Sequence, residues 1–178
     1  MRETSANEIL TFWLIPAEPA RNYFQNLIHD LGARFDAPVF EPHVTLYTTD
    51  PSSEDARDFL ERAVAGTKGC RLNIAGIGHS QEFTKTLFVQ FAPDPDVDAL
   101  NAKFCSASRS QEDYEINPHL SLIYKELPAE EKAVIAAELN IPFREVTFDL
   151  VKAVVSPAEI KSRTAVEAWR VVAETRLG

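Results

Sequence analysis

Two histidines stand in the same short motif at two places in the chain. Residues 42–46 read Pro-His-Val-Thr-Leu and residues 118–122 read Pro-His-Leu-Ser-Leu, so His43 and His119 are separated by a little under half of the 178 residues. Imidazole titrates near neutral pH, so a pair of histidines can supply one general base and one general acid. The hydroxyl in each motif can donate a hydrogen bond to a phosphoryl oxygen. The repeated pattern therefore predicts acid–base chemistry on a phosphate ester.

Both motifs lie in stretches rich in Val, Thr, Leu and Tyr, which predict β-strands. On a strand, residues i and i+2 project to the same face. His43 should therefore share a face with Thr45, and His119 with Ser121, while the aliphatic residues between them turn to the core. Two sheets related by a pseudo-twofold axis would bring both imidazoles and both hydroxyls to one cleft.

The rest of the chain predicts the elements that hold these two strands. We expect helices at 17–35, 52–65, 96–108 and 128–139, and strands at 9–15, 41–49, 71–77, 84–91, 117–124, 144–155 and 168–175. Turns at 76–83 and 156–164 would join two strand pairs as hairpins. This order favours an α+β fold of two antiparallel sheets with helices on their outer faces. The half-chain repeat favours one bilobal domain over residues 1–178, in which each lobe contributes one motif and the cleft lies between the lobes.

Composition restricts the class of protein. The chain has 18 Lys and Arg against 27 Asp and Glu, a formal net charge of −9, so we expect no binding to long nucleic acid, although a small anionic substrate is allowed. No signal peptide is recognised and no apolar run reaches the roughly 20 residues of a membrane helix, so we expect a cytoplasmic monomer without a membrane partner. Cys70 and Cys105 are expected to be free thiols, with a single bridge between them left open.

Several aromatic residues near the motifs have two interpretations. Tyr47 shares the alternation of the first motif and could line the cleft or cap the sheet edge. Trp13 is expected in the core, whereas Phe83 could equally stack on a ligand or pack against the protein. Tyr124 lies an odd number of residues beyond its histidine, so it reaches the cleft only if its strand bulges or ends there.

The remaining polar candidates are less specific. His29 is expected to be solvated on a helix, and His79 to be exposed in a turn. No spacing of Cys, His and carboxylates resembles a zinc site, so we expect no metal and no cofactor. Four cations could neutralise a phosphate, and the sequence selects none of them: Lys85, Lys103, Lys125 and Arg109.

With both motifs intact, the sequence resembles the 2H phosphoesterases, a superfamily named for two His-x-Thr/Ser-x motifs. Within it, residues 119–124 (HLSLIY), 12–16 (FWLIP) and 40–43 (FEPH) are similar to the cyclic phosphodiesterase branch. The resemblance implies a bilobal α+β fold and hydrolysis without a metal. The implied reaction converts a nucleoside 2′,3′-cyclic phosphate to the 2′-phosphate, or ADP-ribose 1″,2″-cyclic phosphate to ADP-ribose 1″-phosphate.

The motif residues would divide the work of that reaction. We expect Thr45 and Ser121 to hold the non-bridging oxygens, and Tyr124 to orient the attacking water. His119 would take a proton from the water and His43 would give one to the departing ribose oxygen, although the sequence also allows the reverse. Two alternatives remain. One is an RNA-end 2′-5′ phosphoesterase or ligase-like enzyme of the same superfamily, which the acidic charge disfavours. The other is a non-catalytic nucleotide-binding module, which would not need two proton-transfer groups.

Overall fold

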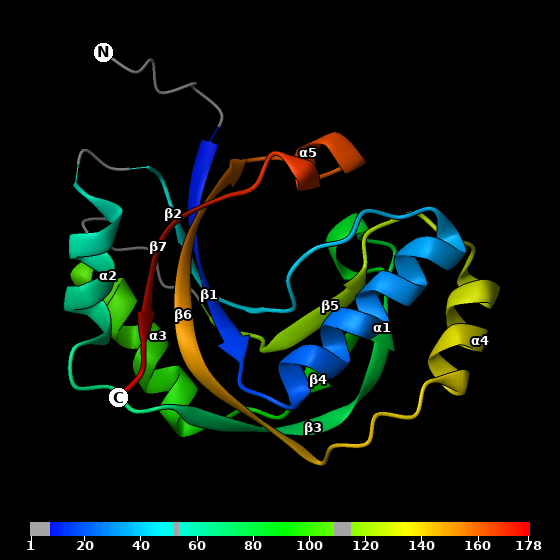
Figure 1. The fold of residues 1–178 in the computed structure, drawn as a ribbon, viewed down its shortest axis with the longest axis horizontal. Coiled ribbons are helices and arrows are strands. Elements are labelled where there is room, and N and C mark those ends of the chain that lie inside the picture. Colours follow the sequence, from blue (N-terminus) through cyan, green and yellow to red (C-terminus); the bar gives the residue numbers. More distant parts are fainter. Residues whose placement is uncertain (1–7, 52–53, 109–114) are drawn as a thin grey trace.

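The computed structural model describes residues 8–51, 54–108 and 115–178, which form seven strands, five α-helices and one 3-10 turn (Figure 1). The strands are β1 (Glu8–Pro16), β2 (Val44–Thr49), β3 (Cys70–His79), β4 (Leu87–Phe91), β5 (His119–Ile123), β6 (Glu145–Pro157) and β7 (Arg170–Arg176). The helices are α1 (Ala20–Phe35), α2 (Ala56–Val64), α3 (Pro95–Ala107), α4 (Ala129–Glu138) and α5 (Arg163–Glu167), and the 3-10 turn is η1 (Phe83–Lys85).

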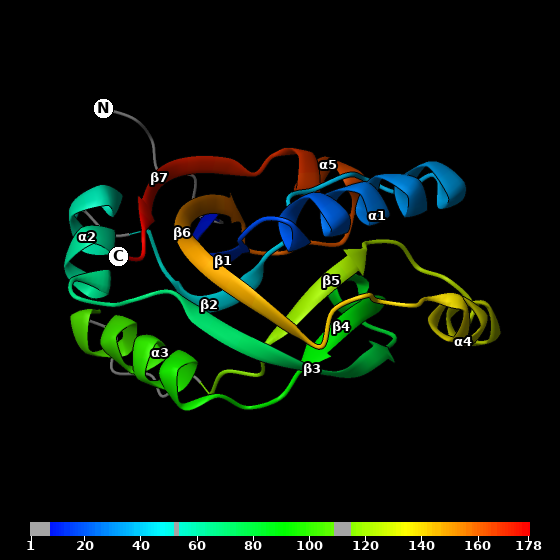
Figure 2. The same ribbon diagram turned by 60° about the horizontal axis from the view of Figure 1, so that its bottom comes forward.

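The strands pair antiparallel throughout the described residues, in the order β1-β2-β5-β4-β3-β6-β7, and β1 also pairs with β6. The predicted α+β class is therefore confirmed. The strands belong to one sheet, where the sequence predicts two. The long strand β6 is the reason, because its first residues pair with β3 and the rest of it pairs with β1 (Figure 2). The division into two lobes about a twofold axis stays a prediction.

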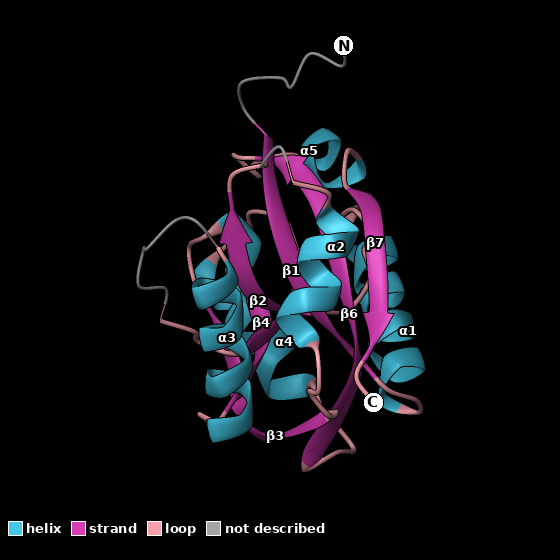
Figure 3. Ribbon diagram, turned by 90° about the vertical axis from the view of Figure 1, so that its left-hand side faces the viewer, coloured by secondary structure: helices cyan, strands magenta, loops and turns pink. Residues whose placement is uncertain are grey.

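Four of the five described helices cover the strands in two groups. α2 and α3 lie side by side at one end of the molecule, and α1 and α4 lie at the other (Figures 1 and 2). Seen from the α2 and α3 end, these two helices stand in front of the strands (Figure 3). No helix in the described parts of the chain is long and apolar enough to cross a membrane.

The elements follow the predicted order, with local differences at turns. β3 continues to His79 and β4 begins only at Leu87, so the first hairpin turn lies later in the chain than expected and contains η1. The second expected turn holds the short helix α5. Ser52 and Ser53, at the expected start of the second helix, lie outside the described residues. α2 begins at Ala56, where the Asp55 side chain accepts hydrogen bonds from two backbone N–H groups of the first turn.

β1 is buried on both faces, as its unbroken apolar run predicts. Leu10, Phe12 and Leu14 belong to the main hydrophobic core. Trp13 and Ile15 point to the opposite face, where they form a second, smaller cluster with residues of β6. The second face of the sheet therefore also carries buried apolar side chains, and the candidate site lies on this face.

Candidate active site

A cavity of about 230 Å³ contains the polar residues of both motifs. His43, Thr45, His119, Ser121 and Tyr124 all line it, so the structure brings together every site residue that the sequence singles out. Their roles stay predictions. The remaining lining comes from β1, β2, η1, β6 and the segments on either side of α5: Ile9, Thr11, Trp13, Thr48, Thr84, Lys85, Ser156, Ile160 and Trp169.

The two imidazoles are oriented in the same way. His43 Nδ1 lies 2.7 Å from the carbonyl oxygen of Glu41, and His119 Nδ1 lies 2.8 Å from that of Asn117. A carbonyl oxygen can only accept, so each Nδ1 carries a proton. In the neutral ring the proton-free nitrogen is then Nε2, and this nitrogen is left to act on a ligand.

Burial controls the charge of both rings. His43 is 6% exposed and stacks on Trp13. Burial lowers the pKa of His43 to about 4, against the opposing effects of the Glu41 carbonyl and carboxylate. Burial also lowers the pKa of His119, and the Lys85 ammonium adds to that effect. Both imidazoles are therefore mainly neutral at pH 7.

A bulge in β2 decides which of its side chains reach the cavity. Phe12 of β1 pairs with Tyr47, but the next residue, Trp13, pairs with Thr45, so Leu46 is an extra residue. The bulge reverses the alternation, and Tyr47 turns to the core side with Phe12, where it is 2% exposed. Both interpretations of Tyr47 from the sequence are wrong, because the alternation of side chains that they assume does not continue through the bulge.

The same bulge adds a residue that the sequence analysis missed. Thr48, beyond the bulge, pairs with Thr11 of β1, and both hydroxyls lie at the cavity, 3.4 Å apart. Ser156 and Trp169 also line it, from β6 and from the residue before β7. No sequence signal marks these four residues, because they become neighbours only through the pairing of β1 with β2 and β6 and of β6 with β7.

Tyr124 reaches the cavity because β5 is irregular at its end. The pairing with β4 skips Leu122, and β5 stops at Ile123, so Tyr124 is released from strict alternation. Its ring is stacked on Phe40, with centroids 4.1 Å apart. Burial raises the pKa of the Tyr124 hydroxyl, and a hydrogen bond with Ser121 opposes that shift. The phenol therefore stays protonated and can donate.

The hydroxyl of Ser121 makes a hydrogen bond within the protein. Ser121 Oγ donates to the carbonyl oxygen of Thr84 at 2.6 Å. Thr84 and Lys85 thus reach the cavity beside the second motif. Of the four candidate cations, Lys85 is the one among the described residues that lines the cavity. Lys103 and Lys125 donate to backbone carbonyls elsewhere, and Arg109 lies outside the described residues.

The other candidates lie apart from the cavity lining. His29 and His79 are exposed. Phe83 is half-buried and stacks on Tyr124, with centroids 6.1 Å apart, so it packs against the protein and does not line the cavity. Cys70 and Cys105 are free thiols. Within residues 8–51, 54–108 and 115–178, no three His, Cys, Asp or Glu side chains are grouped so that they could hold a metal ion.

The chain is similar to known proteins in both sequence and fold. The sequence matches the cyclic phosphodiesterase-like protein family over residues 9–177. It is 25% identical to the cyclic phosphodiesterase of Arabidopsis thaliana over 179 aligned residues, and the alignment covers 98% of each chain. The fold is similar to E. coli LigT complexed with 3′-AMP, with a TM-score of 0.58, 16% identity, and coverage of 96% of this chain and 98% of that one. LigT complexed with phosphate gives a TM-score of 0.57 at 15% identity, with coverage of 97% and 98%.

Proposed function

The chain belongs to the cyclic phosphodiesterase-like protein family, and on that premise we propose that it hydrolyses a small cyclic phosphate with its two histidines and without a metal ion. The resemblance to the 2H phosphoesterases is confirmed, and the protein is a phosphodiesterase. The proposed substrate is a nucleoside 2′,3′-cyclic phosphate, converted to the 2′-phosphate, or ADP-ribose 1″,2″-cyclic phosphate, converted to ADP-ribose 1″-phosphate. The observation that carries the proposal is the paired orientation of His43 and His119, whose Nδ1 atoms both donate to carbonyls.

The proposed reaction is an in-line displacement at phosphorus. His119 Nε2 accepts a proton from water as the water oxygen bonds to phosphorus. The bond from phosphorus to the departing ribose oxygen breaks, and that oxygen takes a proton from His43 Nε2. The cycle closes when the proton held by His119 is lost to solvent and His43 is protonated again.

The surroundings of the two rings support this division of roles. The Lys85 ammonium disfavours a proton on His119, so this ring is free to accept a proton as the general base. The carboxylate of Glu41 favours a proton on His43, and the stacked indole of Trp13 offers its negative face to an imidazolium. Since burial disfavours the charged form of His43, the anionic phosphate would supply the charge that draws a proton to it on binding.

The polar lining supports an anionic ligand of small size. Thr45 would hold the non-bridging oxygens, where negative charge grows in the transition state, and the Ser121 hydroxyl would do the same by turning its proton from the Thr84 carbonyl to the ligand. Lys85 would add a positive charge beside them. The structural neighbour LigT has been solved with 3′-AMP and with phosphate, which agrees with a small phosphate ligand. The proposal further takes the enzyme to act as a cytoplasmic monomer, and not on long nucleic acid, in keeping with its net charge of −9.

Turnover of 2′,3′-cyclic AMP by three variants tests the proposal. His43→Ala and His119→Ala should each lower kcat by about 10²- to 10⁴-fold, the usual worth of general acid–base catalysis. His79→Ala is the matched control, because this exposed histidine lies outside the cavity lining, and its kcat should stay within about twofold of wild type. A loss below about tenfold in both cavity variants would overturn the two-histidine mechanism. Saturable binding without turnover by the wild type would instead indicate a nucleotide-binding module.

A further inference from the structure

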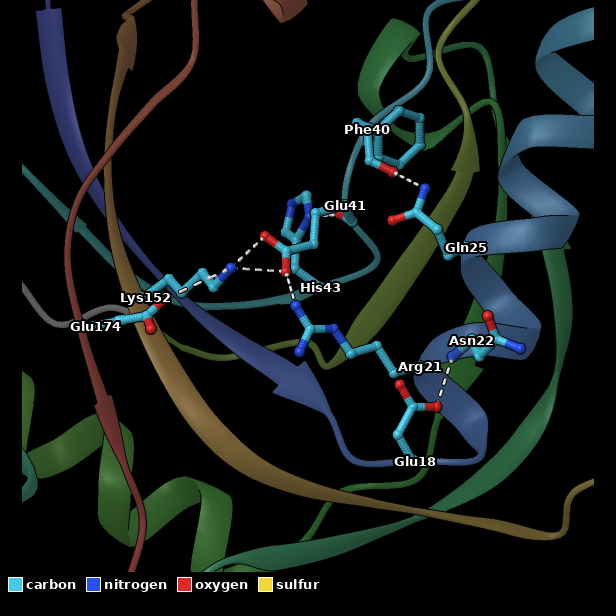
Figure 4. Close-up of polar contacts among 9 residues, drawn as sticks. All are labelled: Glu18, Arg21, Asn22, Gln25, Phe40, Glu41, His43, Lys152 and Glu174. Carbon is cyan, nitrogen blue, oxygen red and sulfur yellow. Dashed lines mark hydrogen bonds and ion pairs between the residues drawn. The ribbon is translucent and has the colours of Figure 1, made fainter.

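We propose that Glu41 is a positioning residue for His43, and that Lys152 and Arg21 hold it in place. The inference deepens the proposed function and rests on it for its kinetic test. Glu41 is not among the described residues that line the cavity, so it would act through the imidazole and not on the substrate. Its backbone carbonyl accepts the hydrogen bond from His43 Nδ1, while its side chain enters an ion-pair cluster on the other side (Figure 4).

Two basic side chains from different elements, Lys152 and Arg21, bind the carboxylate of Glu41, and we call these three side chains the clamp. Lys152 Nζ of β6 lies 2.8 Å from one carboxylate oxygen and 2.9 Å from the other. An Arg21 guanidinium nitrogen, from the first turn of α1, lies 2.7 Å from the same carboxylate. The Lys152 side chain is 12% exposed and that of Glu41 is 20% exposed, with Glu174 of β7 3.7 Å from the ammonium. The pair of Lys152 with Glu41 is partly buried, so solvent and salt weaken it less than a pair on the open surface.

The carbonyl of Glu41 needs such an anchor because it lies outside the regular structure. Residues 37–43 join α1 to β2 without forming a helix or a strand. The clamp ties this connection to α1 on one side and to β6 on the other. Lys152 pairs in register with Trp13, the residue on which the His43 ring stacks, so one stretch of sheet supports both the ring and its hydrogen-bond acceptor.

The carbonyl that orients the second histidine is held by a neutral amide and not by an ion pair. The carbonyl of Asn117 accepts from His119 Nδ1. Gln90 of β4 secures this segment, since its amide nitrogen lies 2.8 Å from Asn117 Oδ1 and 3.0 Å from the carbonyl oxygen of Pro118. Each imidazole thus has an anchored carbonyl behind it. The anchor is ionic for His43 and a neutral amide for His119.

Three variants test the role of the clamp. Glu41→Gln and Lys152→Met should lower kcat by about 10- to 100-fold, the loss expected from a catalytic group displaced by about 1 Å, with KM changed less than about threefold. Lys152→Arg keeps the positive charge and should recover most of the rate. The matched control is Arg71→Gln, which removes an exposed ion pair to Glu145, on the same strand β6, and should leave kcat within about twofold of wild type.

Nitrogen NMR of the His43 ring gives a readout that does not depend on turnover. At pH 7 the wild-type ring should carry its proton on Nδ1 only, and Lys152→Met should show a mixture of the two tautomers. If the folded variant keeps both the wild-type tautomer and the wild-type kcat, the proposal is overturned, even if its melting temperature falls. If the wild type turns over no cyclic phosphate, the proposed function fails, and the tautomer alone decides the positioning role. Arg21→Gln, at a half-exposed position, replaces Lys152→Met if that variant does not fold.

Discussion

The indole of Trp13 lies flat on the imidazole of His43, with ring centroids 3.7 Å apart and planes 10° from parallel. Trp13 is 5% exposed, so the core interpretation from the sequence is correct as far as burial goes. The same ring is also a wall of the candidate site. The residue that keeps His43 away from water is therefore also the one that fixes the plane of its ring.

Burial of a neutral His43 predicts a specific dependence of stability on pH. Its pKa is about 4 in the folded protein and near 6.5 when unfolded, so the unfolded state binds the proton first. The contribution of this residue is fully present above pH 6.5 and is lost as the pH falls to about 4. We expect protonation of His43 to lower the free energy of unfolding by about 3 kcal/mol over that pH range.

Urea unfolding of wild type and His43→Gln at pH 7 and pH 4 measures this effect. Other titrating groups act in both proteins, so the difference between the two pH dependences isolates His43. The wild type should lose more stability on acidification than the variant. Parallel loss in both would mean that His43 is not held neutral by burial.

The hydroxyls of the two motifs predict a loss in kcat that a third hydroxyl should not show. Thr45→Val or Ser121→Ala should lower kcat by about 10²-fold or more, because each removes a donor from the position where charge develops. Thr49→Val is the control, since Thr49 also lies on β2 but pairs with the core residue Leu10 and is absent from the cavity lining. Steady-state kinetics on 2′,3′-cyclic AMP separates them. Equal effects of Thr45→Val and Thr49→Val would contradict a phosphate-binding role for Thr45.

The hydroxyl of Tyr124 predicts a smaller effect. Tyr124→Phe keeps the ring stacked on Phe40 and removes only the hydrogen bond with Ser121 and any contact with the attacking water. We expect kcat to fall by about tenfold, the worth of one ordinary hydrogen bond. Tyr23→Phe is the control, because it removes a phenol that donates to the backbone of Asn140. An unchanged kcat in Tyr124→Phe would remove Tyr124 from the mechanism.

Strand alternation was enough to predict that the histidine and the hydroxyl of each motif lie on the same face of their strand. His43 and Thr45 precede the bulge of β2, and His119 and Ser121 precede that of β5, so the rule that i and i+2 share a face holds for both pairs. The burial of β1 on both faces also followed from its unbroken apolar run. The sequence could predict these features because each depends on local periodicity.

Features that depend on pairing between distant strands could not be predicted in this way. A single extra residue at Leu46 reversed the orientation of Tyr47, and no local signal marks that bulge. Lys152 meets Glu41 only because β6 pairs with β1, across more than half of the chain. The one continuous sheet has the same origin, since nothing in the sequence of β6 shows that it pairs with two neighbours on different parts of its length.

The product formed from 2′,3′-cyclic AMP by the wild-type protein in EDTA tests the central claim most directly. Chromatography should resolve 2′-AMP from 3′-AMP, and the proposed metal-free hydrolysis to the 2′-phosphate predicts that 2′-AMP accumulates at a rate unchanged by the chelator. Accumulation of 3′-AMP, or abolition of turnover by EDTA, would contradict it. So would the absence of any product when ADP-ribose 1″,2″-cyclic phosphate is also left intact.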